Sequence, residues 1–238
     1  MPPRDQHGPA TPPSTTTLAF KRALDLAGAT IGLVLLAPLF VIIAIAIRLE
    51  TPGPALFRQI RVGRGGRPFR IYKFRSMQAR QAPGGTALTV HADRRITRVG
   101  AALRRTKLDE LPQLINVLAG DMSLVGPRPE VPEFMAFYTP EQRAVLLTMR
   151  PGMTDYAAIL FRDESAMLLG EQDPIAVYRY RIMPIKFGYY ERYSHEIGAI
   201  NDLRIIIATV LLLLTGHLPH ALGIEAELQT FTRERIAG

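Results

Sequence analysis

The chain carries one long apolar run near its beginning, with no charged residue between positions 26 and 47. As a helix rising about 1.5 Å per residue, this run would extend roughly 33 Å, close to the roughly 30 Å hydrocarbon core of a bilayer. Residues 1–17 are rich in proline and threonine and too poor in apolar side chains to fold. The pattern predicts a disordered tail over residues 1–17 and a membrane helix within residues 18–50. Its length and the lack of a small-residue cleavage pattern argue against a signal peptide.

Pro38 interrupts the apolar run just past its middle. It removes a backbone donor and biases Ala37 away from helical angles, so a break is expected there. Basic residues prefer the cytoplasmic side, yet they lie on both sides of the run, as Lys21, Arg22 and Arg48. A re-entrant helix, break and helix would keep both ends on the cytoplasmic side, whereas a kinked ordinary span would place one end outside. The residues alone leave both topologies open.

Beyond the apolar run, the chain becomes basic and rich in turn residues. Two short segments, residues 55–61 and 68–74, have the composition of strands and flank a glycine-rich turn at residues 63–66. The turn lacks the lysine, hydroxyl and helix of a P-loop, so we favour a hairpin over a phosphate cradle. Because side chains alternate along an extended segment, Lys73 and Arg75 are expected to share one face.

Apolar residues recur with helical spacing between positions 97 and 119. Pro112 falls inside this pattern and predicts that a new helix starts near Leu108, with Asp109 and Glu110 in its first turn. Carboxylates in that position gain from the helix dipole, so capping is one explanation for the pair. A carboxylate nucleophile surrounded by cations also suits attack on phosphorus, which is the second explanation.

The remaining pattern indicates a mainly α chain with short β elements, an α+β fold. A further apolar stretch at residues 203–214 is short and flanked by charges, so we expect an interfacial or core-packed helix instead of a second span. Between the two regions, Pro127 and Pro129 stiffen a turn that presents Arg128. A fixed guanidinium is well suited to bidentate binding of a phosphate.

Composition narrows the classes of function. The formal net charge is +8, and arginines concentrate between positions 58 and 105, which indicates an anionic partner. No zinc-finger, RNP or helix-turn-helix pattern accompanies the charge, so lipid or nucleotide phosphates are favoured over nucleic acid. The chain has no cysteine, which excludes disulfides and thiolate chemistry, and its five histidines show no spacing typical of a zinc site.

Several motifs in the same order resemble one known family, the bacterial sugar transferases, which are monotopic phosphoglycosyl transferases. These motifs are KRALDLAG, FRQIRVGRGGRPFRIYKFRSM, ITRVGAALRRTKLDELPQLINVLAGDMSLVGPRPE, RPGMT and YYERYSHEIGAINDLRIII. The resemblance covers residues 21–154 and 189–207. It implies a monotopic membrane protein with a re-entrant helix-break-helix and interfacial amphipathic helices. Residues 51–238 would form a cytoplasmic, membrane-associated catalytic domain.

The resemblance also implies a reaction. A UDP-sugar would donate a sugar 1-phosphate to a polyprenyl phosphate such as undecaprenyl phosphate, at the cytoplasmic face of the bacterial inner membrane. Asp109 would attack the sugar-linked phosphorus to form a covalent intermediate and release UMP, and the lipid phosphate would then take the phosphosugar. Glu110 would act as a base or as a partner of Mg2+, with Asp109 as the other metal ligand. This would be the first membrane step of glycoconjugate assembly, such as a polysaccharide, an O-antigen, a capsule or a glycoprotein.

Further positions carry over from the family motifs. The residues expected to bind the phosphates or the nucleotide are Lys73, Arg75, Arg104, Pro127, Arg128, Pro129 and Asp202. Asp202 stands in NDL here, where the family has LDL. The membrane break would lie at Ala37 and Pro38, although a serine frequently precedes that proline. No nucleic-acid partner is implied, and a homodimer stays open.

Residues 155–188 depart from the family pattern, which elsewhere has a tryptophan and an asparagine-glycine-arginine loop; we expect this region to help select the sugar.

Two alternatives remain beside this hypothesis. A basic, membrane-anchored scaffold whose carboxylates merely cap a helix is the competing class. A multi-span sugar-phosphate transferase would need more than one central apolar segment.

Overall fold

The structure is a computed structural model that describes residues 13–78, 95–218 and 223–224, so most of the predicted tail lies outside the described residues. Helix α1 (Thr15–Glu50) is a single helix of 36 residues. Ser14 caps it, because its hydroxyl accepts a hydrogen bond from the Thr17 amide at 3.1 Å. Our prediction of a tail up to residue 17 was therefore wrong by three residues, which form the first turn of α1.

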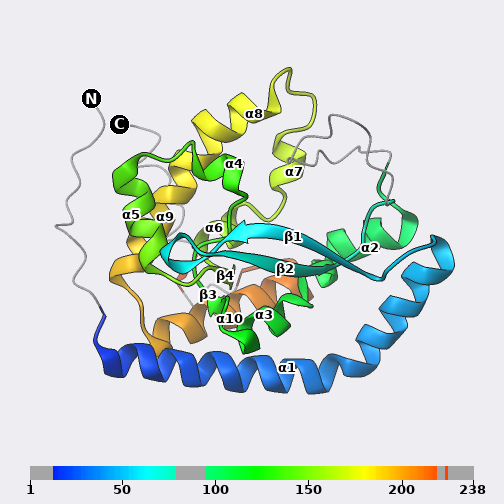
Figure 1. The fold of residues 1–238 in the computed structure, drawn as a ribbon, viewed down its shortest axis with the longest axis horizontal. Helices are drawn as coiled ribbons and strands as arrows, with labels where there is room; N and C mark the ends of the chain where they lie inside the picture. The colour runs from blue at the N-terminus through cyan, green and yellow to red at the C-terminus, as the bar shows by residue number, and fades with distance from the viewer. Residues whose placement is uncertain (1–12, 79–94, 219–222, 225–238) are drawn as a thin grey trace.

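Helix α1 continues through Pro38 without ending. The expected interruption at Ala37 and Pro38 is replaced by a bend, and the ribbon turns upward in its second half (Figure 1). A proline inside a helix removes one backbone hydrogen bond and crowds the preceding turn, which bends the helix without breaking it when the flanking residues are good helix formers. The chain thus changes direction in the predicted region while remaining helical.

The outer side of α1 is an apolar surface. Within the described residues, α1 is the only helix long and apolar enough to cross a membrane, and only 11% of its most apolar window is buried. Its exposed large apolar side chains are Phe20, Leu26, Ile31, Val34, Leu35, Val41, Ile42, Ile45 and Leu49. A core helix of a soluble protein would bury most of these side chains, so the exposed face indicates membrane association.

Both ends of α1 are bound to the rest of the molecule. Near its beginning, Arg22 donates to the carbonyl oxygens of Val117 at 2.8 Å and Leu118 at 3.2 Å. At its other end, the two carboxylate oxygens of Glu50 accept from the backbone amides of Arg98 at 2.7 Å and Val99 at 3.0 Å. The bent helix therefore runs along one side of the folded body instead of projecting from it (Figure 1).

The predicted hairpin is present. Strands β1 (Leu56–Val62) and β2 (Pro68–Phe74) pair antiparallel, with Arg58 opposite Tyr72. The short 3-10 turn η1 (Arg64–Gly66) joins them, and Gly65 there has a φ of 67°, which a glycine adopts without strain. The second strand matches the predicted bounds, and the first is displaced by one residue.

Residues 98–119 form two helices joined by a tight turn. Helix α2 (Arg98–Thr106) ends at Lys107, whose φ of 58° reverses the chain into the 3-10 turn η2 (Leu108–Glu110). Helix α3 (Gln113–Ala119) begins only after Pro112. As predicted, a helical turn begins at Leu108 and contains Asp109 and Glu110; it is a 3-10 turn, and the α-helix itself starts only after Pro112.

After α3, the regular elements of the described residues are helices and a short parallel pair, β3 (Ser123–Val125) and β4 (Gly152–Thr154). Its helices are α4 (Pro132–Met135), α5 (Pro140–Thr148), α6 (Tyr156–Leu160), α7 (Glu164–Met167), α8 (Pro174–Val177), the π-helical η3 (Tyr178–Ile182), α9 (Met183–His195) and α10 (Ala199–Thr215). The largest apolar core lies among these helices and includes Tyr189, Tyr193 and Ile205. Helix α10 confirms the predicted helix at residues 203–214, with one buried side and one exposed apolar side.

Candidate active site

A cavity of about 1050 Å3 lies between η2, the turn at residues 126–129 and the helices that follow β4. Its charged lining residues are Arg61, Lys73, Arg98, Arg104, Arg105, Lys107, Asp109, Glu110, Arg128, Glu130, Asp155, Arg162, Asp163, Glu164 and Lys186. Arginines and lysines outnumber carboxylates in this lining. The cavity is large enough for a small-molecule ligand, and its charge favours an anion.

Glu110 is the centre of a charge cluster on the cavity wall. Its Oε1 accepts a hydrogen bond from Lys73 Nζ at 2.8 Å and another from Arg128 Nη2 at 2.5 Å. Arg128 Nη1 also donates to Oε2 at 3.1 Å, so the guanidinium contacts both carboxylate oxygens. The structure thereby unites Lys73, Glu110 and Arg128, which the sequence placed far apart. Capping of a helix does not explain Glu110, because both of its oxygens contact side-chain cations.

Asp109 differs from its neighbour in having spare hydrogen-bonding capacity. Only 8% of the residue is exposed, and its Oδ1 is buried without a hydrogen-bond partner among the described residues. A buried carboxylate oxygen without a partner is costly, so such an atom in a cavity wall indicates a functional role. Asp109 is therefore an available nucleophile or metal ligand beside two ordered cations.

The two adjacent carboxyls have opposite pKa shifts. Burial raises the pKa of Asp109, and the neighbouring charge of Glu110 raises it further. Burial also acts to raise the pKa of Glu110, but Arg128 and Lys73 outweigh it and hold that pKa well below its usual range. Glu110 in turn raises the pKa of the Arg128 guanidinium well above its usual value. Paired carboxyls whose environments separate their pKa values are typical of sites with two distinct chemical roles.

The turn that presents Arg128 is fixed on both sides. The Pro127 carbonyl accepts from the Gly152 amide at 2.9 Å, and the Pro129 carbonyl accepts from Arg61 Nη1 at 3.0 Å. The backbones are so close that a Cβ on Gly152 would lie 2.1 Å from the nitrogen of Gly126, so only glycine fits there. Pro127 and Pro129 thus act through the backbone, and their rings stiffen the support of Arg128.

Two of the predicted phosphate-binding cations lie in different places. Arg104 lines the cavity, as expected. Arg75 does not: its guanidinium donates to the carbonyl oxygens of Thr51 at 2.7 Å and Pro52 at 2.6 Å, where it satisfies the end of α1. Strand β2 ends at Phe74, so the alternation that would have placed Arg75 beside Lys73 no longer applies. The assignment of Arg75 to phosphate binding is therefore corrected.

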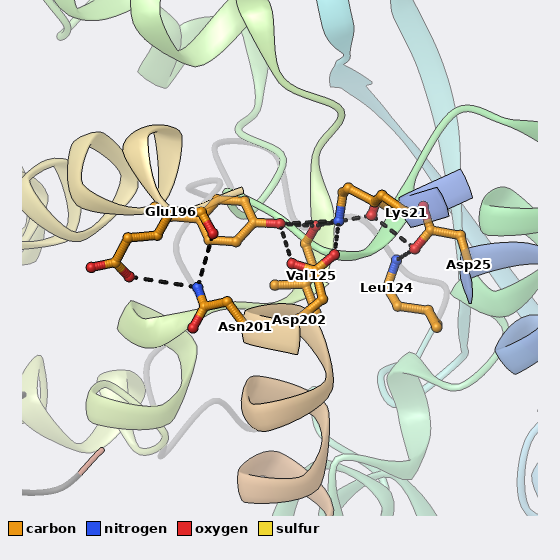
Figure 2. Close-up of polar contacts among 9 residues, drawn as sticks. Lys21, Asp25, Leu124, Val125, Glu196, Asn201 and Asp202 are labelled. Carbon is orange, nitrogen blue, oxygen red and sulfur yellow. Dashed lines mark hydrogen bonds and ion pairs between the residues drawn. The ribbon is translucent and has the colours of Figure 1, made fainter. Parts of the chain in front are cut away.

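Asp202 was also predicted at the phosphate site, and the structure places it elsewhere. Its Oδ2 accepts from Lys21 Nζ at 2.5 Å, and its Oδ1 accepts from the Tyr193 hydroxyl at 2.7 Å. Lys21 Nζ also donates to the Val125 carbonyl at 2.8 Å (Figure 2). Asp202 is 1% exposed and does not line the cavity. Its partners make it part of a structural junction between α1, α9, α10 and β3.

Asp25 extends this junction along α1. Its Oδ1 accepts from the Ser123 hydroxyl at 2.9 Å and from the Leu124 amide at 2.8 Å (Figure 2). Lys21 and Asp25 therefore hold both ends of β3, the strand that leads directly into the turn bearing Arg128. We name Lys21, Asp202 and Tyr193 the Lys21 cluster, and Glu110, Lys73 and Arg128 the Glu110 cluster.

Sequence reasoning missed several polar residues of the cavity. Arg61 and Glu130 approach the Arg128 turn from β1 and from the residues after the turn, while Asp155, Glu164 and Lys186 line the wall formed by the later helices. No local motif marks them, because each reaches the cavity through long-range folding. The only available signal was the sequence departure at residues 155–188, which pointed to a region without identifying its residues.

The expectation that Asp109 and Glu110 bind Mg2+ can be compared with the oxygen atoms that each carboxylate offers. Asp109 has an unpaired oxygen and therefore fits a role as a ligand for Mg2+, which prefers carboxylate oxygens and water. Glu110 fits less well, because both of its oxygens already accept hydrogen bonds from cations. Among the described residues, no group of three or more histidine or acidic side chains is arranged to hold a metal. Asp109 therefore fits Mg2+ better than Glu110 does.

Comparison with known proteins identifies the family of the chain. Residues 16–216 match the family model described as bacterial sugar transferase. A Caulobacter vibrioides UDP-glucose:undecaprenyl-phosphate glucose-1-phosphate transferase is 42% identical over 197 residues, covering 82% of this chain and 70% of that protein. The Rhizobium leguminosarum exopolysaccharide production protein PSS is 40% identical over 213 residues, covering 83% of this chain and 96% of that protein.

A third relative shows that members differ in length and in the sugar they are named for. The Aeromonas hydrophila UDP-N-acetylgalactosamine-undecaprenyl-phosphate N-acetylgalactosaminephosphotransferase is 43% identical over 150 residues. The aligned part covers 62% of this chain but 36% of that protein, so the chain spans only a part of this relative's length. The printed names of these relatives include both glucose and N-acetylgalactosamine.

Proposed function

The chain belongs to the bacterial sugar transferase family, and from that premise we propose that it is an enzyme that moves a sugar 1-phosphate from a UDP-sugar to undecaprenyl phosphate. The observation that carries the proposal is the unpaired, buried Oδ1 of Asp109 beside the Glu110 cluster in a cation-rich cavity. That arrangement supplies a nucleophile and the positive charge that a diphosphate needs.

In the proposed first step, Asp109 attacks the phosphorus that carries the sugar. A bond forms between the carboxylate oxygen and phosphorus, the bond from phosphorus to the bridging oxygen breaks, and UMP leaves with the electron pair. In the second step, an oxygen of the lipid phosphate attacks the same phosphorus and releases the Asp109 carboxylate. Each displacement is balanced, and the enzyme returns to its starting state.

Glu110 has a positioning role in this proposal. Its carboxylate contacts Lys73 and Arg128 together, so it holds two cations in fixed directions before the substrate arrives. The low pKa of Glu110, caused by those cations in opposition to burial, keeps it ionised at neutral pH. An incoming phosphate can then share the donors of Arg128 without the entropy cost of ordering a free side chain. Mg2+, when bound, would neutralise diphosphate charge, with Asp109 as the residue that would hold it.

The lipid acceptor has a matching route. The cavity is also lined by Ile206, Val210 and Leu213 of α10, and Val210 and Leu213 are 47% and 38% exposed. An apolar wall that continues onto an exposed helix face suits a prenyl chain that arrives from the bilayer. The lipid phosphate would then reach the cations of the cavity while its chain stays in apolar surroundings.

The proposed topology is monotopic and re-entrant, at the cytoplasmic face of the inner membrane. Its support is that Arg22 and Glu50, near the two ends of α1, both bind the folded body. A straight span would carry one end roughly 30 Å away, across the hydrocarbon core. Cysteine labelling at position 10, in this chain without natural cysteines, tests the side directly. Labelling from the periplasm would contradict the re-entrant topology.

The central experiment separates the covalent mechanism from its alternatives. Purified protein in lipid nanodiscs is mixed with a panel of UDP-sugars and Mg2+ before any acceptor is added. We expect a burst of UMP stoichiometric with enzyme and, by intact mass, one phosphosugar adduct on the peptide containing residues 108–113. Asp109→Asn is the matched control and should give neither signal, whereas Glu110→Gln should retain a slow burst.

The other outcomes are equally informative. UMP release that requires both substrates, with no adduct, would indicate direct transfer through a ternary complex and would reduce Asp109 to a metal ligand. Absence of UMP release with every donor and with undecaprenyl phosphate present would favour the scaffold alternative, in which the basic surface binds the membrane without chemistry.

A further inference from the structure

Tyr190 is a buried residue of the cavity wall that the proposed reaction does not use. It lies on α9, is 1% exposed and lines the cavity, yet its hydroxyl has no hydrogen-bond partner among the described residues. The nearby Tyr178 differs, because its hydroxyl donates to Glu130 Oε1 at 2.9 Å. Burial raises the pKa of Tyr190 well above its usual range, so the hydroxyl keeps its proton and can donate.

Other buried or partly buried polar groups line the same cavity as Tyr190. Lys186 Nζ, in a residue that is 2% exposed, donates to Glu164 Oε2 at 2.8 Å. Asp155 is also 2% exposed, and one of its oxygens accepts from the Ala158 amide at 2.9 Å. Carboxylates, an ammonium and a phenol together offer the donors and acceptors that complement hydroxyl or acetamido groups. This wall carries mixed charge, unlike the cation-rich wall around Arg128.

Arg128 links the two walls. Its charge interacts with that of Glu164 as well as with that of Glu110, and it lowers the pKa of Asp155 in opposition to burial. The sugar of a nucleotide sugar is attached directly to the terminal phosphate. If Arg128 holds that phosphate, the sugar lies next to it, and the Tyr190 wall is a polar surface of the same cavity.

We propose that Tyr190, Asp155 and the Lys186–Glu164 pair form the subsite that recognises the sugar of the donor. The proposal rests on the proposed function and goes beyond it, because it assigns residues to sugar selection. Tyr190 donates to a sugar oxygen, and the carboxylates accept from sugar hydroxyls. A site built to bind such groups rejects donors that lack them, because its buried polar atoms are then left unpaired.

The test measures what the sugar adds to nucleotide affinity. Calorimetry on the full chain in nanodiscs compares UDP with uncleavable analogues, in which a methylene group replaces the bridging oxygen. The analogues are those of UDP-glucose, UDP-galactose, UDP-N-acetylglucosamine and UDP-N-acetylgalactosamine. For wild type, at least one analogue should bind more tightly than UDP. In Tyr190→Phe this gain should fall about tenfold while the affinity for UDP stays unchanged.

Stability measurements separate recognition from a structural role. Because the Tyr190 hydroxyl has no partner, Tyr190→Phe should not lower the melting temperature. Tyr156→Phe is the matched control: Tyr156 is equally buried, but its hydroxyl donates to Glu196 at 2.8 Å and Asn201 at 2.9 Å, away from the cavity. That variant should lower the melting temperature and leave the sugar gain unchanged. Asp155→Asn keeps a side-chain oxygen that can accept from the Ala158 amide at the start of α6. This variant should also reduce the gain in affinity that the sugar provides.

Three results would overturn the subsite: no analogue binding more tightly than UDP, an unchanged gain in Tyr190→Phe, or an equal loss for UDP and the analogues. The proposed function is judged separately, by release of UMP from cleavable donors. A chain that shows a Tyr190-dependent sugar gain but releases no UMP would keep the subsite and refute the transferase. A chain that releases UMP without that gain would keep the transferase and refute the subsite.

Discussion

The Glu110 cluster and the Lys21 cluster are both ionic groups that join distant parts of the chain. The side chains of Lys21 and Asp202 are 11% and 1% exposed, whereas those of Lys73, Glu110 and Arg128 are 17%, 16% and 35% exposed. In the Lys21 cluster, the lysine donates to three acceptors, and both oxygens of Asp202 are occupied. In the Glu110 cluster, the ion pairs lie on a cavity wall beside Asp109, whose Oδ1 is unpaired. Ion pairing is therefore common to both clusters. What distinguishes the proposed active site is unused hydrogen-bonding capacity in a residue that lines a cavity.

The largest expected effect is the loss of activity in Asp109→Asn. If Asp109 is the nucleophile, UMP release should fall by at least about a thousandfold. The melting temperature should be unchanged or raised, because burial disfavours the charge that the substitution removes. Steady-state UMP release and a thermal melt on the same preparation check both parts. Retained activity would remove Asp109 from the mechanism and, with it, the contrast between the clusters.

The substitution in the Lys21 cluster that corresponds to Asp109→Asn is Asp202→Asn. Breaking a buried ion pair by removing one partner costs about 3 to 5 kcal/mol, so the free energy of unfolding should fall by that amount. Turnover per folded molecule should remain close to wild type at low temperature, because Asp202 does not line the cavity.

A double-mutant cycle sharpens this comparison. Lys21→Met alone should be about as destabilising as Asp202→Asn, and the double variant should lose less than the sum of the two. Strict additivity would show that the pair makes no coupled contribution. A large loss of turnover in a fully folded Asp202→Asn protein would return Asp202 to the reactive site.

Arg128→Lys should give an intermediate effect. A lysine retains the charge but cannot contact both oxygens of Glu110 as the guanidinium does. We expect kcat/KM for the donor to fall by about 10- to 100-fold, with a rise in donor KM. Arg143→Lys is a suitable control, since Arg143 lies on α5 and does not line the cavity. Unchanged donor kinetics in Arg128→Lys would contradict the phosphate contact.

The smallest expected effect concerns pH. Burial raises the pKa of Asp155 from 3.8 to about 6, so the folded state favours the protonated carboxyl. Its contribution to stability is then complete below the unfolded pKa and is lost as pH rises through about 6. Relative to Asp155→Asn, the wild type should lose roughly 1 to 3 kcal/mol between pH 4 and pH 7. Denaturant unfolding of both proteins across that range checks this, and parallel curves would contradict it.

Local chemistry allowed much of the fold to be predicted from the sequence. The hairpin followed from alternating residues around glycines, and α10 followed from an uninterrupted apolar stretch. The helical turn that begins at Leu108 followed from Pro112, although its 3-10 form leaves no sign in the apolar spacing. Prediction worked where a few neighbouring residues decide the backbone, and failed at Pro38, where α1 continues as a helix.

The residues of the candidate site also divide into those that the local sequence predicts and those that it does not. Asp109, Glu110 and Arg128 lie in motifs whose residues carry a family resemblance, so they were found. Arg75 was misassigned because the strand ends one residue earlier, and Asp202 because its partner Lys21 is distant in sequence. The pairing of Lys186 with Glu164 and the unpaired hydroxyl of Tyr190 arise only from packing. Such contacts depend on the whole fold and leave no local pattern.

The Lys21–Asp202 pair also sets an order of events during synthesis. The two residues are 181 positions apart. At about 5 to 20 residues per second, Asp202 leaves the ribosome roughly 10 to 40 s after Lys21. During that interval α1 can contact β3 through Lys21 and Asp25, but Lys21 lacks its carboxylate partner on α10. The Lys21–Asp202 pair can therefore form only after α10 has been made, well after β3 and the Arg128 turn.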